Sequence, residues 1–165
     1  MKSILEFCEA NDACEEGREW ALENCTDMQQ AWETLPTNWL IWTATREGVL
    51  TDKELRLFAV FCARQVEHLL TDDRSRNAIT VAEKFANGEA TKEELEAAWA
   101  AAEEAAEAAW AAGAAAEEAA WAAGAAARAG DAAAEAAREA AWAAWAAAGD
   151  AQSFWLRNNT NPNFN

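Results

Sequence analysis

The chain has 165 residues, enough for one or two small domains, and 29 acidic against 13 basic side chains give it a formal net charge of −16. Because nucleic acids and anionic membranes attract basic surfaces, this charge argues against a nucleic-acid or membrane-surface binder. Hydrophobic residues make up 52% of the chain, yet its mean hydropathy is only −0.30, since most of them are alanine. Ten Trp and no Tyr complete an unusual composition.

The first residues and the cysteines indicate a cytoplasmic protein. The N-terminal segment has one Lys and no apolar run as long as a signal peptide. Ten of the residues from 97 to 148 are charged, so this alanine-rich tract is not expected to span a membrane. In a reducing compartment the four cysteines are expected to be buried apolar side chains, with a thiolate metal site that includes Cys14, Cys25 and His68 as the alternative.

Residues 1–90 carry helix signals throughout and no alternating strand pattern. Side chains that cap helices precede the apolar stretches, and Pro or Gly follows them. The first three expected helices run from a cap at Asp12 to about Cys25, from Thr26 or Asp27 to Pro36, and from Asn38 to Arg46 before Gly48.

The most apolar helix is expected next. Thr51 and Glu54 form a capping box, in which the hydroxyl and the carboxylate accept hydrogen bonds from free amides at the helix start. Apolar side chains then recur at helical spacing as far as Leu70, over so wide an arc that this is the expected central core helix. A further helix over residues 74–87 stops at Gly88.

The second half opens with another capping box, from Thr91 to Glu94, and then becomes a low-complexity tract. Of the residues from 97 to 148, 34 are Ala, which has the highest helix propensity, so the tract is expected to be helical. Gly130 and Asp131 form a helix stop followed by a cap, which predicts a hairpin of two long helices.

Trp99, Trp110 and Trp121 recur every eleven residues, almost three helical turns, so their indoles form a nearly straight row. On a helical wheel the row lies within the charged sector, and the opposite arc holds only Ala and Gly. We therefore expect the Ala/Gly arc to close the hairpin. The Trp row either packs on residues 1–90 or forms a partly exposed ridge that docks another protein.

The sequence lacks the residue patterns that common catalytic sites require. The chain has one His, no nucleophile elbow and no Gly-rich phosphate loop, and adjacent carboxylates on a helix point about 100° apart. We expect no enzyme activity, no cofactor and no bound metal.

Three segments resemble the alanine-rich immunity-protein family of bacterial and phage genomes. They are Ala13–Trp20, Asn38–Trp42 and the run from Leu55 to Thr91 with the Ala/Trp tract behind it, so the resemblance extends to about Arg157. It implies an all-helical fold and a role in binding and neutralising a toxin or defence effector. It supplies no catalytic residues.

These observations together predict an all-α protein with a compact helical domain over residues 1–90, an Ala/Trp-rich hairpin over 91–157 and a flexible tail over 158–165. We expect a non-enzymatic protein of immunity or anti-defence type, whose acidic helices and Trp anchors neutralise a partner protein with a basic surface. The alternative is a phage or bacterial structural or assembly protein that self-associates through its Ala/Gly helix faces. The candidate partner-binding residues are Trp99, Trp110, Trp121, Trp142, Glu103, Glu107, Glu117 and Glu118.

Overall fold

The computed structural model describes residues 2–111, 125–126, 133–143 and 145–165, and every regular element in these ranges is a helix. The predicted all-α class is therefore confirmed. The elements are α1 (Ile4–Ala10), α2 (Glu15–Asn24), α3 (Met28–Thr34), α4 (Thr37–Ala44), α5 (Asp52–Val66), the 3₁₀ turn η1 (Glu67–Leu69), α6 (Asp73–Ala86), α7 (Lys92–Ala111), α9 (Ala133–Ala143) and α10 (Trp145–Asn159).

Capping signals begin and end the middle helices as predicted. At the start of α5 the Thr51 hydroxyl accepts a hydrogen bond from the Glu54 amide (3.3 Å), and the Glu54 carboxylate accepts one from the Thr51 amide (2.9 Å). The same exchange joins Thr91 and Glu94 at the start of α7. After α6, Gly88 has a φ of +77°, a left-handed conformation that costs glycine nothing and ends the helix.

The predicted cap of α2 is wrong. Asp12 has a φ of +52°, whereas an N-cap residue is normally extended. Cys14 is extended instead, and its sulfur accepts a hydrogen bond from the Gly17 amide (3.4 Å). The prediction relied on the oxygen of the Asp side chain, but the backbone conformation decides which residue can cap.

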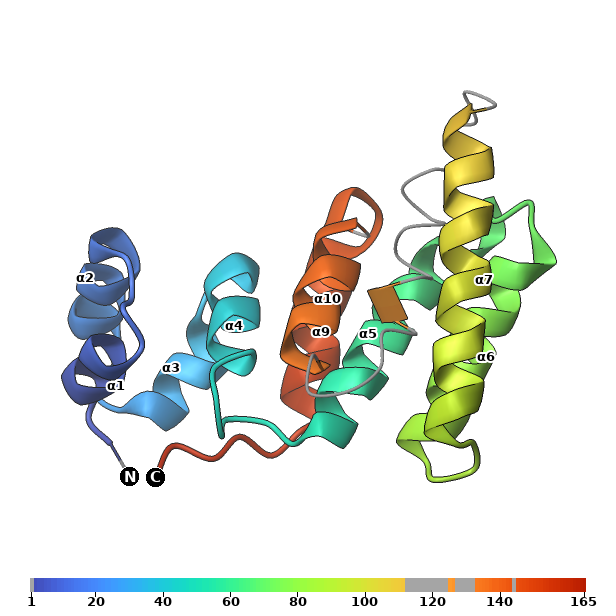
Figure 1. The fold of residues 1–165 in the computed structure, drawn as a ribbon. Helices are drawn as coiled ribbons and strands as arrows, with labels where there is room; N and C mark the ends of the chain where they lie inside the picture. Colours follow the sequence, from blue (N-terminus) through green and yellow to red (C-terminus); the bar gives the residue numbers. More distant parts are fainter. Residues whose placement is uncertain (1, 112–124, 127–132, 144) are drawn as a thin grey trace.

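The C-terminal helices lie in the middle of the fold. Helices α9 and α10 both pack on α5, and α10 also packs on α4. Figure 1 shows the helices in a row, with α1 and α2 at one end, α6 and α7 at the other, and α9 and α10 between α4 and α5. Trp32, Phe58 and Leu156 belong to one buried cluster that draws on both halves of the chain. Of the predicted hairpin over 91–157, α9 and α10 thus cover apolar faces of α4 and α5, which belong to the predicted domain over 1–90.

Helix α7 buries the face that the helical wheel assigns to alanine. Leu95, Ala98, Ala102 and Ala106 are buried, and α6 packs along α7. The alanine faces of α7 and α9 are thus used against helices of the first half, α6 and α5. The glycines expected on the closing arc, Gly113 and Gly124, lie outside the described residues. None of the helices in the described ranges, α7 included, is long and apolar enough to cross a membrane.

The end of the chain is anchored, whereas its Asn-rich composition predicts a flexible tail over 158–165. Phe164 is only 4% exposed, and its ring lies 5.8 Å from that of Phe7 and 6.0 Å from that of Trp32, between centroids. The Lys2 amide donates a hydrogen bond to the Phe164 carbonyl (2.7 Å), which brings the two ends of the chain together (Figure 1). One aromatic side chain near the terminus therefore fills a core position and orders the segment around it.

Candidate partner-binding groove

A groove of about 220 Å³ lies between α4 and α9. Pockets that hold a drug-sized ligand usually measure roughly 300–1,000 Å³, so this groove matches a side chain of another protein better than a whole small molecule. Its lining residues are Asn38, Ile41 and Trp42 from α4 and Arg138, Ala141 and Trp142 from α9.

Trp142 protrudes beside this groove. Its side chain is 82% exposed, although the neighbouring Ala141 is only 1% exposed. Helix α9 packs on α5 and buries Ala137, Ala140 and Ala141, which lie on one side of the helix. Because residues four apart share a helix face, Arg138 and Trp142 both lie on the outer face. A Trp buries about 150–250 Å² when it is covered, so the exposed indole is a large unused apolar surface.

The opposite wall is held by a contact between Trp42 and Arg46. The Arg46 guanidinium lies 4.8 Å from the centroid of the Trp42 ring, in cation–π contact. Its Nε donates to the Trp42 carbonyl (3.0 Å) and an Nη to the Thr45 hydroxyl (3.3 Å), and both of these acceptors are neutral. Burial, and after it the charge of Arg138, lowers the pKa of Arg46. The positive charge of Arg138 therefore acts on Arg46, which lies against the groove residue Trp42.

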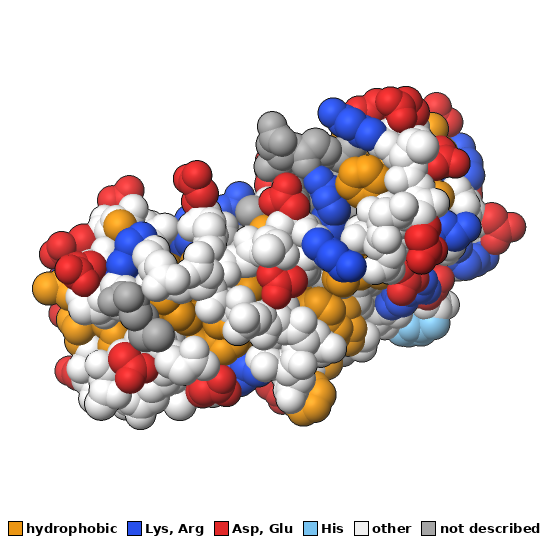
Figure 2. All heavy atoms as spheres, turned by 90° about the horizontal axis from the view of Figure 1, so that it is seen from below, with side chains coloured by type: hydrophobic (Ala, Val, Ile, Leu, Met, Phe, Trp, Pro, Cys, Tyr) orange, Lys and Arg blue, Asp and Glu red, His pale blue; other side chains and the backbone are white. Residues whose placement is uncertain are grey.

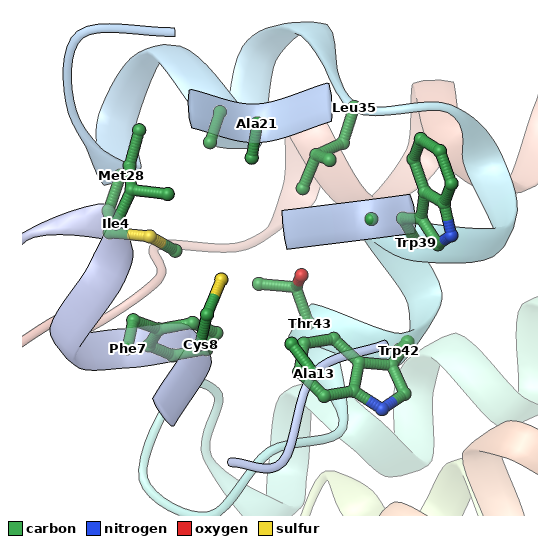
Figure 3. A pocket seen from close by; sticks show the side chains of 12 residues that line it. Ile4, Phe7, Cys8, Ala13, Ala21, Met28, Leu35, Trp39, Trp42 and Thr43 are labelled. Atoms are coloured by element: carbon green, nitrogen blue, oxygen red, sulfur yellow. The ribbon is translucent and has the colours of Figure 1, made fainter. Parts of the chain in front are cut away.

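Trp42 also lines a smaller space inside the N-terminal helices. This cavity measures about 30 Å³ and is bordered by apolar side chains of α1 to α4, among them Phe7, Met28 and Trp39 (Figure 3). It could hold about one water molecule, but a stable buried water needs several polar partners, and the walls are almost entirely apolar. The cavity is therefore a packing gap and not a ligand site.

The predicted partner-binding residues fall in two regions. On α7, Glu103 and Glu107 are exposed, Trp99 is half-buried against the core, and Trp110 belongs to the last turn. Trp142 lies on α9, at the groove. The remaining candidates, Trp121, Glu117 and Glu118, lie outside the described residues.

Acidic side chains are spread over the face of the molecule in Figure 2. Figure 2 shows Asp and Glu side chains distributed over both ends of the face that it presents. On α7, Glu96 pairs with Lys92 (3.8 Å) and Glu104 with Arg74 (3.3 Å). Both ion pairs are exposed to solvent, so they contribute little to stability.

The residues of the alternative thiolate site do not come together. Cys25 is buried and shares a hydrogen bond with Thr34 (3.3 Å), Cys14 caps α2, and His68 is exposed on η1. Among the residues that the structure describes, no three His, Cys, Asp or Glu side chains form a group suited to a metal ion. Of the four cysteines, Cys8, Cys25 and Cys62 are buried as expected and Cys14 is exposed.

Sequence reasoning missed Trp42, Arg46 and Arg138. A signal was present, because Trp42 and Arg46 are four residues apart, as are Arg138 and Trp142, and side chains at this spacing meet on a helix. Nothing in the sequence, however, indicates that α4 and α9 lie beside each other.

Comparison of the chain with protein-family models, with curated proteins and with solved structures found no match. The resemblance to the immunity-protein family therefore stays a prediction.

Proposed function

We propose that the protein is a non-enzymatic binding protein that docks a partner protein at the groove between α4 and α9, with Trp142 as its anchor. The observation that carries the proposal is the 82% exposure of Trp142 beside an apolar groove. Tryptophan is enriched among the few residues that supply most of the energy of protein interfaces. Trp142 borders the groove together with Ile41, Trp42 and Ala141, and contiguous exposed apolar surface of this kind marks interaction sites.

The charge of the chain supports a partner with a basic surface. The net charge is −16, and Glu103 and Glu107 are two of the exposed carboxylates that contribute to it, on α7. Complementary charge speeds the encounter of two proteins, while buried aromatic contacts supply most of the affinity. The family resemblance adds the class of partner, a toxin or defence effector that the protein neutralises by covering its surface.

Self-association through Ala/Gly faces has less support. Ala98, Ala102 and Ala106 are buried, and α7 packs along α6. The alanine face of α7 is thus occupied within the chain, and no other observation favours assembly as the function.

Partner capture tests the proposal. The tagged protein, Trp142→Ala and Glu103→Lys/Glu107→Lys are incubated with extract of the source cells, and the retained protein is purified and titrated at several salt concentrations. Removal of a hot-spot Trp costs about 2 kcal/mol of binding, so we expect Trp142→Ala to bind about 30-fold more weakly. Its stability in urea should stay unchanged, because the side chain is exposed. The charge reversal should slow association and reduce its salt dependence.

Glu9→Lys/Glu19→Lys is the matched control, because it changes the net charge equally at exposed positions on α1 and α2. It should slow association less than the reversal on α7. Equal affinity of the wild-type protein and Trp142→Ala for the captured partner would contradict the proposal. Light scattering at several concentrations tests self-association. A dimer that is lost in Trp142→Ala would mean that the groove binds a second copy of this chain and not a different protein.

A further inference from the structure

We infer that the groove receives an aromatic side chain of the partner and that a carboxylate next to this side chain lies against Arg138, on the side where Arg46 supports Trp42. The inference rests on the proposed function and specifies the part of the partner that the groove recognises.

An aromatic occupant follows from the walls. Trp42 and Trp142 border the groove from two helices, so a ring between them can contact an indole on each side. The protein already packs aromatic rings in this way elsewhere, since Trp155 lies 5.7 Å from Phe58 and 5.6 Å from Phe61, between ring centroids. A groove of about 220 Å³ has room for such a side chain but not for a whole helix.

A carboxylate follows from the charges. Arg138 lines the groove, and Arg46, which lies against Trp42, donates its two hydrogen bonds to neutral acceptors, a carbonyl and a hydroxyl. A partner side chain in the groove removes water from Arg138, and a carboxylate offsets this cost through charge-assisted hydrogen bonds. A Lys or Arg of the partner at this place would add a further like charge.

This local preference is compatible with a partner that is basic elsewhere. The net charge of −16 acts at long range and selects the surface that approaches, whereas the arginines act only at contact. The same net charge makes two copies of this chain repel each other, so the occupant belongs to a different protein.

The test uses the ¹⁵N-labelled full chain and three short peptides. Acetyl-Ser-Phe-Glu-Ser-amide carries the proposed pair, a second peptide replaces its Glu by Lys, and a third replaces its Phe by Ala. The readout is the indole N–H signal of Trp142, identified by its loss in Trp142→Phe. We expect the Phe-Glu peptide to shift this signal saturably and to bind about fivefold more tightly than the Phe-Lys peptide, while the Ala peptide has no effect.

The order of the two Phe peptides should reverse in Arg138→Glu. It should persist in Lys84→Glu, the matched control, which changes the net charge equally at an exposed position of α6. Equal or tighter binding of the Phe-Lys peptide, an order that Arg138→Glu leaves unchanged, or no shift of the Trp142 signal would each overturn the inference. None of these results would touch the dependence of partner capture on Trp142, so the inference can fail while the proposed function stands. The proposed function alone fails if the peptides behave as expected but the captured partner binds the wild-type protein and Trp142→Ala equally well.

Discussion

Arg157 is expected to hold the two halves of the chain together. From α10 its Nε donates to the Trp32 carbonyl (3.0 Å) and an Nη to the Leu35 carbonyl (2.6 Å), at the end of α3. The last carbonyls of a helix have no partner within it, so Arg157 satisfies groups that would otherwise be partly buried and unpaired. We expect Arg157→Met to keep the apolar stem of the side chain and to remove both hydrogen bonds.

The expected loss follows from these two contacts. A hydrogen bond to a charged group contributes about 1.5–3 kcal/mol, and the partial exposure of Arg157 places both bonds at the lower end. Arg157→Met should therefore lower the free energy of unfolding by about 2–3 kcal/mol and the melting temperature by about 5–10 °C. Arg157→Lys, which can reach at most one of the carbonyls, should lose roughly half as much.

Urea denaturation measures the loss, and hydrogen exchange locates it. Exchange in Arg157→Met should accelerate more over residues 28–35 than over α6, because the lost contacts lie at the end of α3. Lys84→Met is the control, an exposed cation replaced by the same side chain, and it should change stability by less than about 0.5 kcal/mol. A change equally small in Arg157→Met would refute the assigned role of Arg157.

Three further predictions concern the core and the pH dependence of stability. Phe164→Ala should lower the free energy of unfolding by about 3 kcal/mol in a urea titration, because a buried aromatic side chain is lost, and an unchanged midpoint would mean that the C-terminal segment is not docked. Burial raises the pKa of the Cys62 thiol, so above about pH 9 the thiol loses its proton in the unfolded chain but keeps it in the folded one. The free energy of unfolding should therefore fall by up to about 1.4 kcal/mol per pH unit in urea titrations above pH 9. Cys62→Ala should flatten this slope, and the exposed Cys14→Ala should not. Burial opposes it, but hydrogen bonds from Thr51 and Asn161 lower the pKa of Glu54. Glu54→Gln should therefore lower the free energy of unfolding by roughly 0.5–1 kcal/mol near neutral pH, and by nothing once acid has protonated the wild-type carboxyl. A difference between the two proteins that persists in acid would contradict this.

The parts of the fold that the sequence predicts are those whose partners lie close together in the chain. The capping boxes at Thr51 and Thr91 and the stop at Gly88 need only residues within one helical turn, and the structure confirms them. The expectation for the C-terminus differs from the structure because Phe164 packs on Phe7 and Trp32, more than a hundred residues away. The choice of α6 and α5 as the neighbours of α7 and α9 was not predictable either, because a stripe of alanines presents nearly the same surface to any helix.

Larger side chains determine which helices pack together, and the candidate groove depends on them. On α10, Gln152 is fully buried, and its side-chain amide donates a hydrogen bond to the Ala141 carbonyl (2.9 Å), near the C-terminal end of α9. The same helix carries Arg157, which holds α3. Helix α10 thus fixes α9 from one side and the N-terminal helices from the other, and this places Trp142 beside Trp42. A groove that depends on such contacts has no motif in the sequence, because its residues come from two helices that are far apart in the chain. For the same reason, Arg157→Met should weaken binding of the Phe-Glu peptide even though Arg157 does not line the groove.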